Sequence, residues 1–185
     1  MHKDDMNMTA SDIRALQYLL DKSELYDLVM KYARYTDRRD RKALRSLYHD
    51  DAIEDRGEMF KGTIDEFIKW SGAAAEKYEL TIHRISNTIF EIDGNKAQGE
   101  VYAEAYHRTN PPDQKDIIAY GRYLDHYEKR DRVWKFKYRT STTDRCEIRP
   151  VDTAWYKEFV AGSPSGLPGA DDPSYKILTM FTRCG

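Results

Sequence analysis

The chain has 185 residues, of which 40% are hydrophobic and 34% are charged, and its formal net charge is −2. This length suits one well-packed core, and the nearly neutral charge argues against a nucleic acid or an anionic membrane as the partner, because either would normally require a basic excess. The cysteines, Cys146 and Cys184, form neither a disulfide framework nor a metal-ligand spacing, and no stretch resembles a signal peptide or a membrane span. We therefore expect one cytoplasmic domain at residues 11–150, between a flexible N-terminus (1–10) and a C-terminal extension (151–185) that packs over the mouth of a pocket or on a neighbouring subunit.

The first half of the sequence is predicted to be helical. Ser11 is a candidate N-cap of a short helix, and Ser23 restarts the chain in a longer helix that runs to Asp40. Asp40 can cap a third helix, with the sequence RKALRSLY. A short strand, Ala52 to Asp55, and the turn RGEMFKG follow, and the capping box Thr63-Ile-Asp-Glu66 opens a fourth helix.

The second half changes from a period of 3.6 residues to a period of 2, which is typical of strands. Asp93-Gly94-Asn95 is a hairpin turn, and Asn110-Pro-Pro-Asp113 closes the strand that follows it. Four strands are predicted to form an antiparallel meander: Glu79 to Ile92, Lys96 to Arg108, Asp116 to Lys129, and Val133 to about Ile148.

The second of these strands has an inner face of small residues that ends in a histidine. Its odd positions are Ala97, Gly99, Val101, Ala103, Ala105 and His107, and its even positions are mostly polar. Small residues where a core would normally hold leucine or isoleucine predict a cavity. The alternative is that large helix side chains, such as Trp70, fill the space.

Asp37 is the unusual residue of the long helix. It continues an apolar row that includes Val29 and Ala33, and it lies at the helix C-terminus, where the helix dipole disfavours negative charge. A carboxylate in this position requires a partner, unless it is simply a solvated residue at a frayed end.

His83 is the candidate partner. It shares its strand face with Ile85 and Ile89, and a helix packed on a curved sheet would bring this face towards the long helix. A carboxylate beside an imidazole fixes its tautomer and stabilises the imidazolium. Such a pair is a metal-free general base that contributes about 10²–10⁴-fold to a rate.

The sequence lacks the motifs of metal-dependent enzymes and serine hydrolases. The histidines, which are His2, His49, His83, His107 and His126, show no metal-ligand spacing, and no G-x-S-x-G motif indicates a serine hydrolase. We therefore expect neither a metal nor another cofactor.

Three segments together resemble the SnoaL-like branch of the nuclear transport factor 2-like superfamily. They read YARYTDRRDRKALRSLYHDDA, TIHRISNTIFEIDGNKAQGEVYAEAYHR and GRYLDHYEKRDRVWKFKYR. The resemblance implies a cystatin-like, cone-shaped α+β barrel with N-terminal helices on a curved antiparallel sheet. It also implies the chemistry of the superfamily enzymes scytalone dehydratase, bile acid 7α-dehydratase and hexachlorocyclohexane dehydrochlorinase, in which an Asp–His pair is the base of an elimination.

The resemblance assigns roles to particular residues. Asp37 and His83 take the places of the Asp–His pair, Tyr32 that of an active-site tyrosine or lysine, and Arg139 that of an arginine that assists the leaving group. Further candidates on segments that face the pocket are Asp55, Trp70, His107, Tyr120, Tyr123, Asp144 and Arg145.

Two of these assignments depart from ideal geometry. Tyr32 is turned about 140° from Asp37 on a regular helix, so their convergence requires the helix end to unwind. Strand parity places Arg139 on the face opposite to Trp134 and Phe136. It faces the pocket only if those side chains face outwards or a β-bulge intervenes.

These features predict a cofactor-free lyase, a dehydratase acting on a hydroxylated hydrophobic ring compound such as a steroid or polyketide, in a homodimer or homotrimer. An isomerase or polyketide-cyclase-like enzyme with the same base is the first alternative. A non-catalytic module, either a ligand carrier or a subunit like the beta subunit of ring-hydroxylating dioxygenases, is the second.

Overall fold

The computed structural model describes residues 8–112 and 114–184. Residues 1–7 of the predicted flexible N-terminus and Asp113 of the predicted turn lie outside this range. The helical elements are α1 (Ala10–Asp37), α2 (Arg41–Ser46), η1 (Gly57–Met59, a 3-10 turn), α3 (Ile64–Ala75), α4 (Thr153–Phe159) and α5 (Pro173–Ile177). The strands are β1 (Tyr48–Asp55), β2 (Lys61–Thr63), β3 (Tyr78–Asp93), β4 (Lys96–Thr109), β5 (Lys115–Arg130) and β6 (Val133–Pro150).

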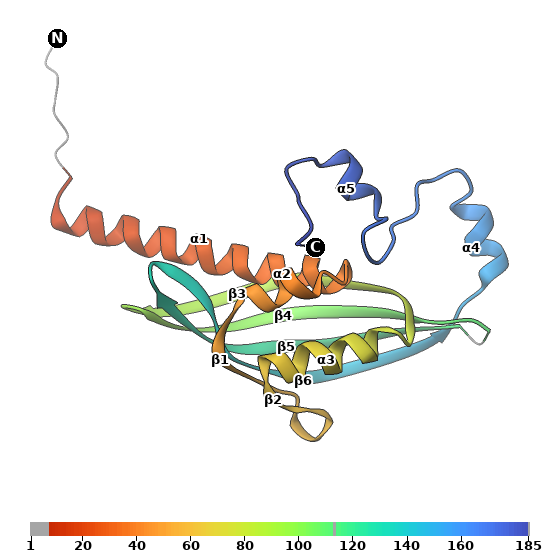
Figure 1. The fold of residues 1–185 in the computed structure, drawn as a ribbon, viewed down its shortest axis with the longest axis horizontal. Coiled ribbons are helices and arrows are strands. Elements are labelled where there is room, and N and C mark those ends of the chain that lie inside the picture. Colours follow the sequence, from red (N-terminus) through yellow and green to blue (C-terminus); the bar gives the residue numbers. More distant parts are fainter. Residues whose placement is uncertain (1–7, 113, 185) are drawn as a thin grey trace, which may run out of the picture.

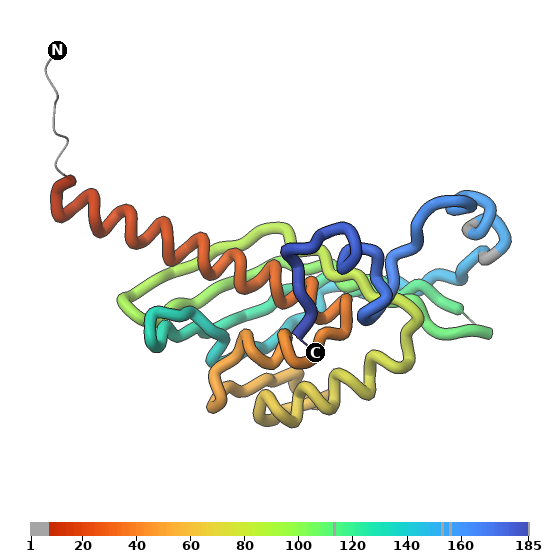
Figure 2. Tube along the Cα trace, turned by 45° about the horizontal axis from the view of Figure 1, so that its top comes forward, coloured from red at the N-terminus to blue at the C-terminus, as the bar shows by residue number. Residues whose placement is uncertain are grey.

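The two N-terminal helices predicted from Ser11 and Ser23 are a single helix, α1. Thr9 caps it in a capping box with Asp12, so the chain is already helical at both serines. Further along α1, the buried carboxylate of Asp21 accepts hydrogen bonds from the side chains of Lys129 in β5 and Trp134 in β6. The first part of α1 extends beyond the strands in Figures 1 and 2.

The other predicted caps are confirmed. The side chain of Asp40 accepts a hydrogen bond from the Ala43 N–H at 3.1 Å and begins α2. Thr63 and Glu66 form the predicted capping box of α3, with the Thr63 N–H donating to Glu66 at 2.8 Å. Each cap satisfies N–H groups that the first turn of a helix leaves unpaired.

The sheet has six strands in the order β2-β1-β6-β5-β4-β3 (Figure 1). Strands β3 to β6 form the predicted antiparallel meander, but β1 runs parallel to β6, so the sheet is mixed rather than antiparallel. The parallel pairing arises because β1 reaches β6 from the helical layer instead of through a hairpin. The architecture is otherwise the predicted α+β fold.

A β-bulge in β6 changes which of its side chains face the core. Tyr127 pairs with Phe136 and His126 pairs with Tyr138, which leaves Lys137 as the extra residue. Arg139 consequently faces the same side as Trp134 and Phe136. All three side chains are buried.

The small residues in the second half of β4 leave space between the sheet and the helices. A Cβ atom at Gly99 would lie 2.9 Å from the Phe90 ring, so large side chains fill that end of the inner face. Ala103, Ala105 and His107, by contrast, line a pocket. The predicted cavity is therefore present over this half of the strand, whereas near Gly99 the space is filled by the strand side chains Phe90 and Tyr127 and not by helix side chains such as Trp70.

The C-terminal extension returns to the junction of α1 and α2 (Figure 2). Arg183 donates hydrogen bonds to the carbonyl oxygens of Arg38 and Arg39, each at 2.9 Å, and the Cys184 N–H donates to Asp40 at 3.1 Å. Buried Asp172 lies 3.5 Å from Arg38. The end of the chain is thus fastened beside the C-terminus of α1.

Candidate active site

A pocket of about 340 Å³ lies between the helices and the inner face of the sheet. This volume is at the small end of the range of ligand sites, about 300–1,000 Å³. Its wall is mostly apolar and aromatic. It is lined by residues of α1, the β1–α3 connection, α3 and strands β3 to β6; none comes from the described part of the C-terminal extension.

Asp37 and His83 meet at the edge of this pocket. Asp37 Oδ1 lies 2.7 Å from His83 Nδ1, and Asp37 Oδ2 accepts the His83 backbone N–H at 2.9 Å. Their side chains are 10% and 9% exposed, respectively. With the neutral ring, the bond to the carboxylate places the proton on Nδ1, so the Nε2 lone pair is free to accept a proton from a ligand.

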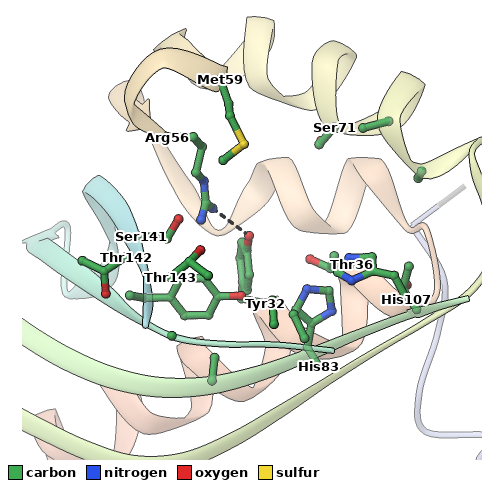
Figure 3. A pocket seen from close by; sticks show the side chains of 18 of the residues that line it. Tyr32, Thr36, Arg56, Met59, Ser71, His83, His107, Ser141, Thr142 and Thr143 are labelled. Atoms are coloured by element: carbon green, nitrogen blue, oxygen red, sulfur yellow. Dashed lines mark hydrogen bonds between the residues drawn. The ribbon is translucent and has the colours of Figure 1, made fainter. Parts of the chain in front are cut away.

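This bidentate contact explains how Asp37 is tolerated at the end of α1. The C-terminal dipole disfavours the carboxylate, but two N–H donors from β3 hydrogen-bond to it. One of these donors is backbone, so the contact also fixes α1 to the strand. His83 lines the pocket (Figure 3), whereas Asp37 does not.

His107 lies beside the pair. Its ring centroid is 5.7 Å from that of His83 in an edge-on arrangement, and 4.7 Å from that of Tyr78. Burial, reinforced by the neighbouring His83, lowers the pKa of His107 to about 4. His107 is therefore an uncharged wall residue near neutral pH.

Tyr32 reaches the pocket without the unwinding that ideal geometry required. α1 remains helical to Asp37, and the two side chains act on different parts of the site, since Tyr32 lines the cavity while Asp37 holds His83 from the side. The Tyr32 hydroxyl accepts a hydrogen bond from Arg56 Nη2 at 3.2 Å (Figure 3).

Arg56 is the main residue that sequence reasoning missed. It follows β1 directly, in a segment interpreted only as a turn, yet its side chain is 10% exposed and lines the pocket. Its Nη2 lies 2.9 Å from Oε2 of Glu54, which is fully buried. Although burial lowers it, the Glu54 carboxylate raises the pKa of Arg56 above its ordinary value.

Arg139 does not line the pocket, in contrast to the role in leaving-group assistance that the resemblance implied. Its guanidinium is fully buried and makes two 2.7 Å hydrogen bonds to Asp125. It also lies 4.1 Å from the Tyr32 ring centroid and 4.2 Å from that of Tyr123. Arg139 therefore supports two rings of the pocket wall from behind.

The remaining candidates divide into two groups. Tyr120, Tyr123 and Trp70 line the pocket. Asp55, Asp144 and Arg145 do not, because their side chains pair elsewhere: Asp55 with Lys61, Asp144 with Arg122, and Arg145 with Glu147.

Small hydroxyl side chains were also missed as wall residues. Thr36, Ser71, Ser141, Thr142 and Thr143 line the cavity. The last three form a polar run in β6, and this interruption of the apolar alternation was the one signal in the sequence.

Two general features complete the description of the site. Among the described residues, no group of three or more His, Cys, Asp or Glu side chains is arranged to hold a metal ion. Over the same residues, no helix is both long and apolar enough to cross a membrane.

The fold is similar to those of several solved structures, with low sequence identity. A candidate scytalone dehydratase from Novosphingobium aromaticivorans is 25% identical with a TM-score of 0.64, over 70% of this chain and 88% of that one. A hexachlorocyclohexane dehydrochlorinase, LinA type 2, is 21% identical with a TM-score of 0.64, over 75% of this chain and 94% of that one. A cystatin-like protein from Nostoc punctiforme is 19% identical with a TM-score of 0.54, over 75% and 96%. No curated protein matches the sequence.

The sequence itself matches the SnoaL-like domain over residues 17–140, which include most of α1, the meander up to the middle of β6 and the Asp37–His83 contact. The chain therefore belongs to the SnoaL-like domain family, within the nuclear transport factor 2-like superfamily.

Proposed function

We propose that the protein is a cofactor-free lyase that removes water from a hydroxylated, hydrophobic ring compound. The observation that carries the proposal is the Asp37–His83 contact at the edge of a largely apolar pocket. An apolar wall favours binding of the ring of a ligand, and His83 Nε2, with its ring oriented by Asp37, is the group that can accept a proton from it.

Each residue of the pair has a distinct role. His83 Nε2 takes a proton from a ring carbon, and the electron pair of the broken C–H bond forms a double bond as the hydroxyl leaves. The protonated His83 returns the proton to the departing oxygen, so water is the product. Asp37 holds the ring by Nδ1 and stabilises the imidazolium between these steps, and the Tyr32 hydroxyl is placed to donate a hydrogen bond to a substrate oxygen.

The comparisons support a reaction of this class without identifying the substrate. The scytalone dehydratase relative is named for the loss of water, and it is 25% identical over most of the domain. The small volume of the cavity favours a compact ring compound, which narrows the earlier expectation of a steroid or polyketide.

The replacement His83→Ala tests the proposal. We expect it to abolish turnover of ring compounds with a hydroxyl group two carbons from a carbonyl, while changing the free energy of unfolding by only about 1 kcal/mol. His126→Ala is the matched control, because His126 is exposed and does not line this pocket. Loss of one water in the product mass would identify the reaction.

Two results would contradict the proposal. A fully active His83→Ala protein would remove His83 as the base. A product with the mass of the substrate would indicate an isomerase or cyclase instead of a dehydratase.

A further inference from the structure

Arg56 is a charged side chain in the pocket wall to which the proposed elimination assigns no task. Phe67 and Tyr123 flank its guanidinium, with ring centroids 5.4 and 5.5 Å away. An arginine buried among aromatic rings loses hydration, so its position is stable only if other groups satisfy its charge and its N–H donors.

The charge is satisfied from the side away from the cavity. Glu54 lies 2.9 Å from Arg56 and is fully buried, and the Tyr48 hydroxyl donates a hydrogen bond to the other carboxylate oxygen. Glu54 does not line the pocket. A ligand thus meets a guanidinium whose charge is already balanced.

The donors are satisfied only in part. Over residues 8–112 and 114–184, the polar partners of the Arg56 side chain are Glu54 and Tyr32, and both contacts use Nη2. A guanidinium has five N–H groups, so others remain available at a wall that the ligand shares. Figure 3 shows Arg56 and the Tyr32 hydroxyl together, with His83 on the other side of Tyr32.

We propose that Arg56 and Tyr32 form an acceptor site that selects uncharged ring compounds with a carbonyl oxygen and discriminates against carboxylates. A carbonyl oxygen accepts N–H donors without adding charge. A carboxylate would add a negative charge to a mostly apolar cavity whose lining arginines are already paired, Arg56 with Glu54 and Arg122 with Asp144 and Glu100. The selectivity thus depends on the buried counter-ion as much as on the arginine.

This inference rests on the proposed function for its catalytic consequence. When a proton passes from the carbon beside the carbonyl to His83 Nε2, the electron pair of that C–H bond moves onto the carbonyl oxygen. The negative charge then lies beside Arg56 and the positive charge beside Asp37. The hydroxyl group then leaves and takes the proton back from His83, so both charges disappear.

Binding of three matched bicyclic probes tests the acceptor site without requiring turnover. The probes are 2-tetralone, the hydrocarbon tetralin and tetralin-2-carboxylate, titrated at about pH 8 so that the acid is ionised. We expect the wild-type protein to bind the ketone about tenfold more tightly than the hydrocarbon, and the carboxylate no more tightly than the hydrocarbon. Arg56→Met should abolish the preference for the ketone. Glu54→Gln should retain that preference and increase carboxylate affinity by tenfold or more, because the guanidinium charge is then unbalanced.

Two further variants keep the test decisive. Arg56→Met leaves the Glu54 charge unpaired and can fail to fold, whereas the double variant with Glu54→Gln removes both charges and should also lose the ketone preference. His83→Ala should leave the ranking of the three probes unchanged, which separates this inference from the proposed elimination. The inference is overturned if the folded wild-type protein binds the carboxylate best or binds none of the probes, or if the ketone preference survives without Arg56.

Discussion

The buried pairs Asp37–His83 and Arg139–Asp125 both lie near the pocket, and they differ in what they present to it. Asp37–His83 places an imidazole at the wall, whereas Arg139–Asp125 is fully buried and lines no part of the cavity. The family resemblance made Arg139 a candidate for chemistry, and the strand face of His83 together with the same resemblance made His83 one. The difference shows that a buried charged group can act on a ligand only if one of its polar atoms faces the cavity; otherwise it stabilises the wall.

Removal of the arginine from the fully buried pair should have the largest effect on stability. Arg139→Met leaves Asp125 without its cation, so we expect the free energy of unfolding to fall by about 3–5 kcal/mol in urea titrations. The double variant with Asp125→Leu should recover much of this loss. A single variant with wild-type stability would show that the pair does not support the wall.

Asp37→Asn should affect activity more than stability. The amide cannot stabilise an imidazolium, so we expect kcat to fall about a hundredfold, while its oxygen can still accept the His83 backbone N–H. Asp55→Asn is the matched control, since Asp55 does not line the pocket. Equal losses of kcat in the two variants would remove the functional distinction of Asp37.

His107 should make the stability of the protein depend on pH. Because its folded pKa is about 4 and its ordinary value is 6.5, the unfolded chain binds a proton between these pH values that the folded chain does not. The free energy of unfolding should therefore fall as the pH drops from about 6.5 to about 4, by on the order of 2 kcal/mol. His107→Asn should flatten this slope in urea titrations at several pH values, and an unchanged slope would exclude His107 as its source.

The smallest expected effect concerns the C-terminal extension. Arg183→Ala removes two hydrogen bonds to the end of α1, and we expect the free energy of unfolding to fall by about 1 kcal/mol, together with faster amide exchange at residues 34–40. Arg149→Ala, in the exposed end of β6, is the control. Unchanged exchange at residues 34–40 in the Arg183 variant would show that the extension does not hold α1 in place.

The sequence predicted the features that depend on local patterns. Strand periodicity predicted the four-stranded meander, and the caps at Asp40 and Thr63 were found where the sequence placed them. The conflict between Asp37 and the helix dipole predicted a partner, and strand parity predicted which residue it would be. These predictions depend on patterns among residues close in sequence. The one long-range step is the contact between Asp37 of the helical layer and His83 of the sheet.

The features that the sequence did not predict depend on distant segments. The parallel pairing of β1 with β6 has no local pattern, and it is this pairing that positions Glu54 and Arg56 beside the cavity. The β6 bulge was recognised only as a condition for Arg139 to face the core. Whether that arginine reached the ligand then depended on Asp125, which was not identified in the sequence as its partner.

The contacts of Arg183 and Cys184 with the α1–α2 junction have a consequence for biosynthesis. The helix that carries Asp37 precedes the strands in the chain, whereas Arg183 and Cys184, which fasten the end of that helix, follow them. A nascent chain cannot complete these contacts until the intervening strands have been made. We therefore expect the end of α1 to reach its final position only after the sheet has been synthesised.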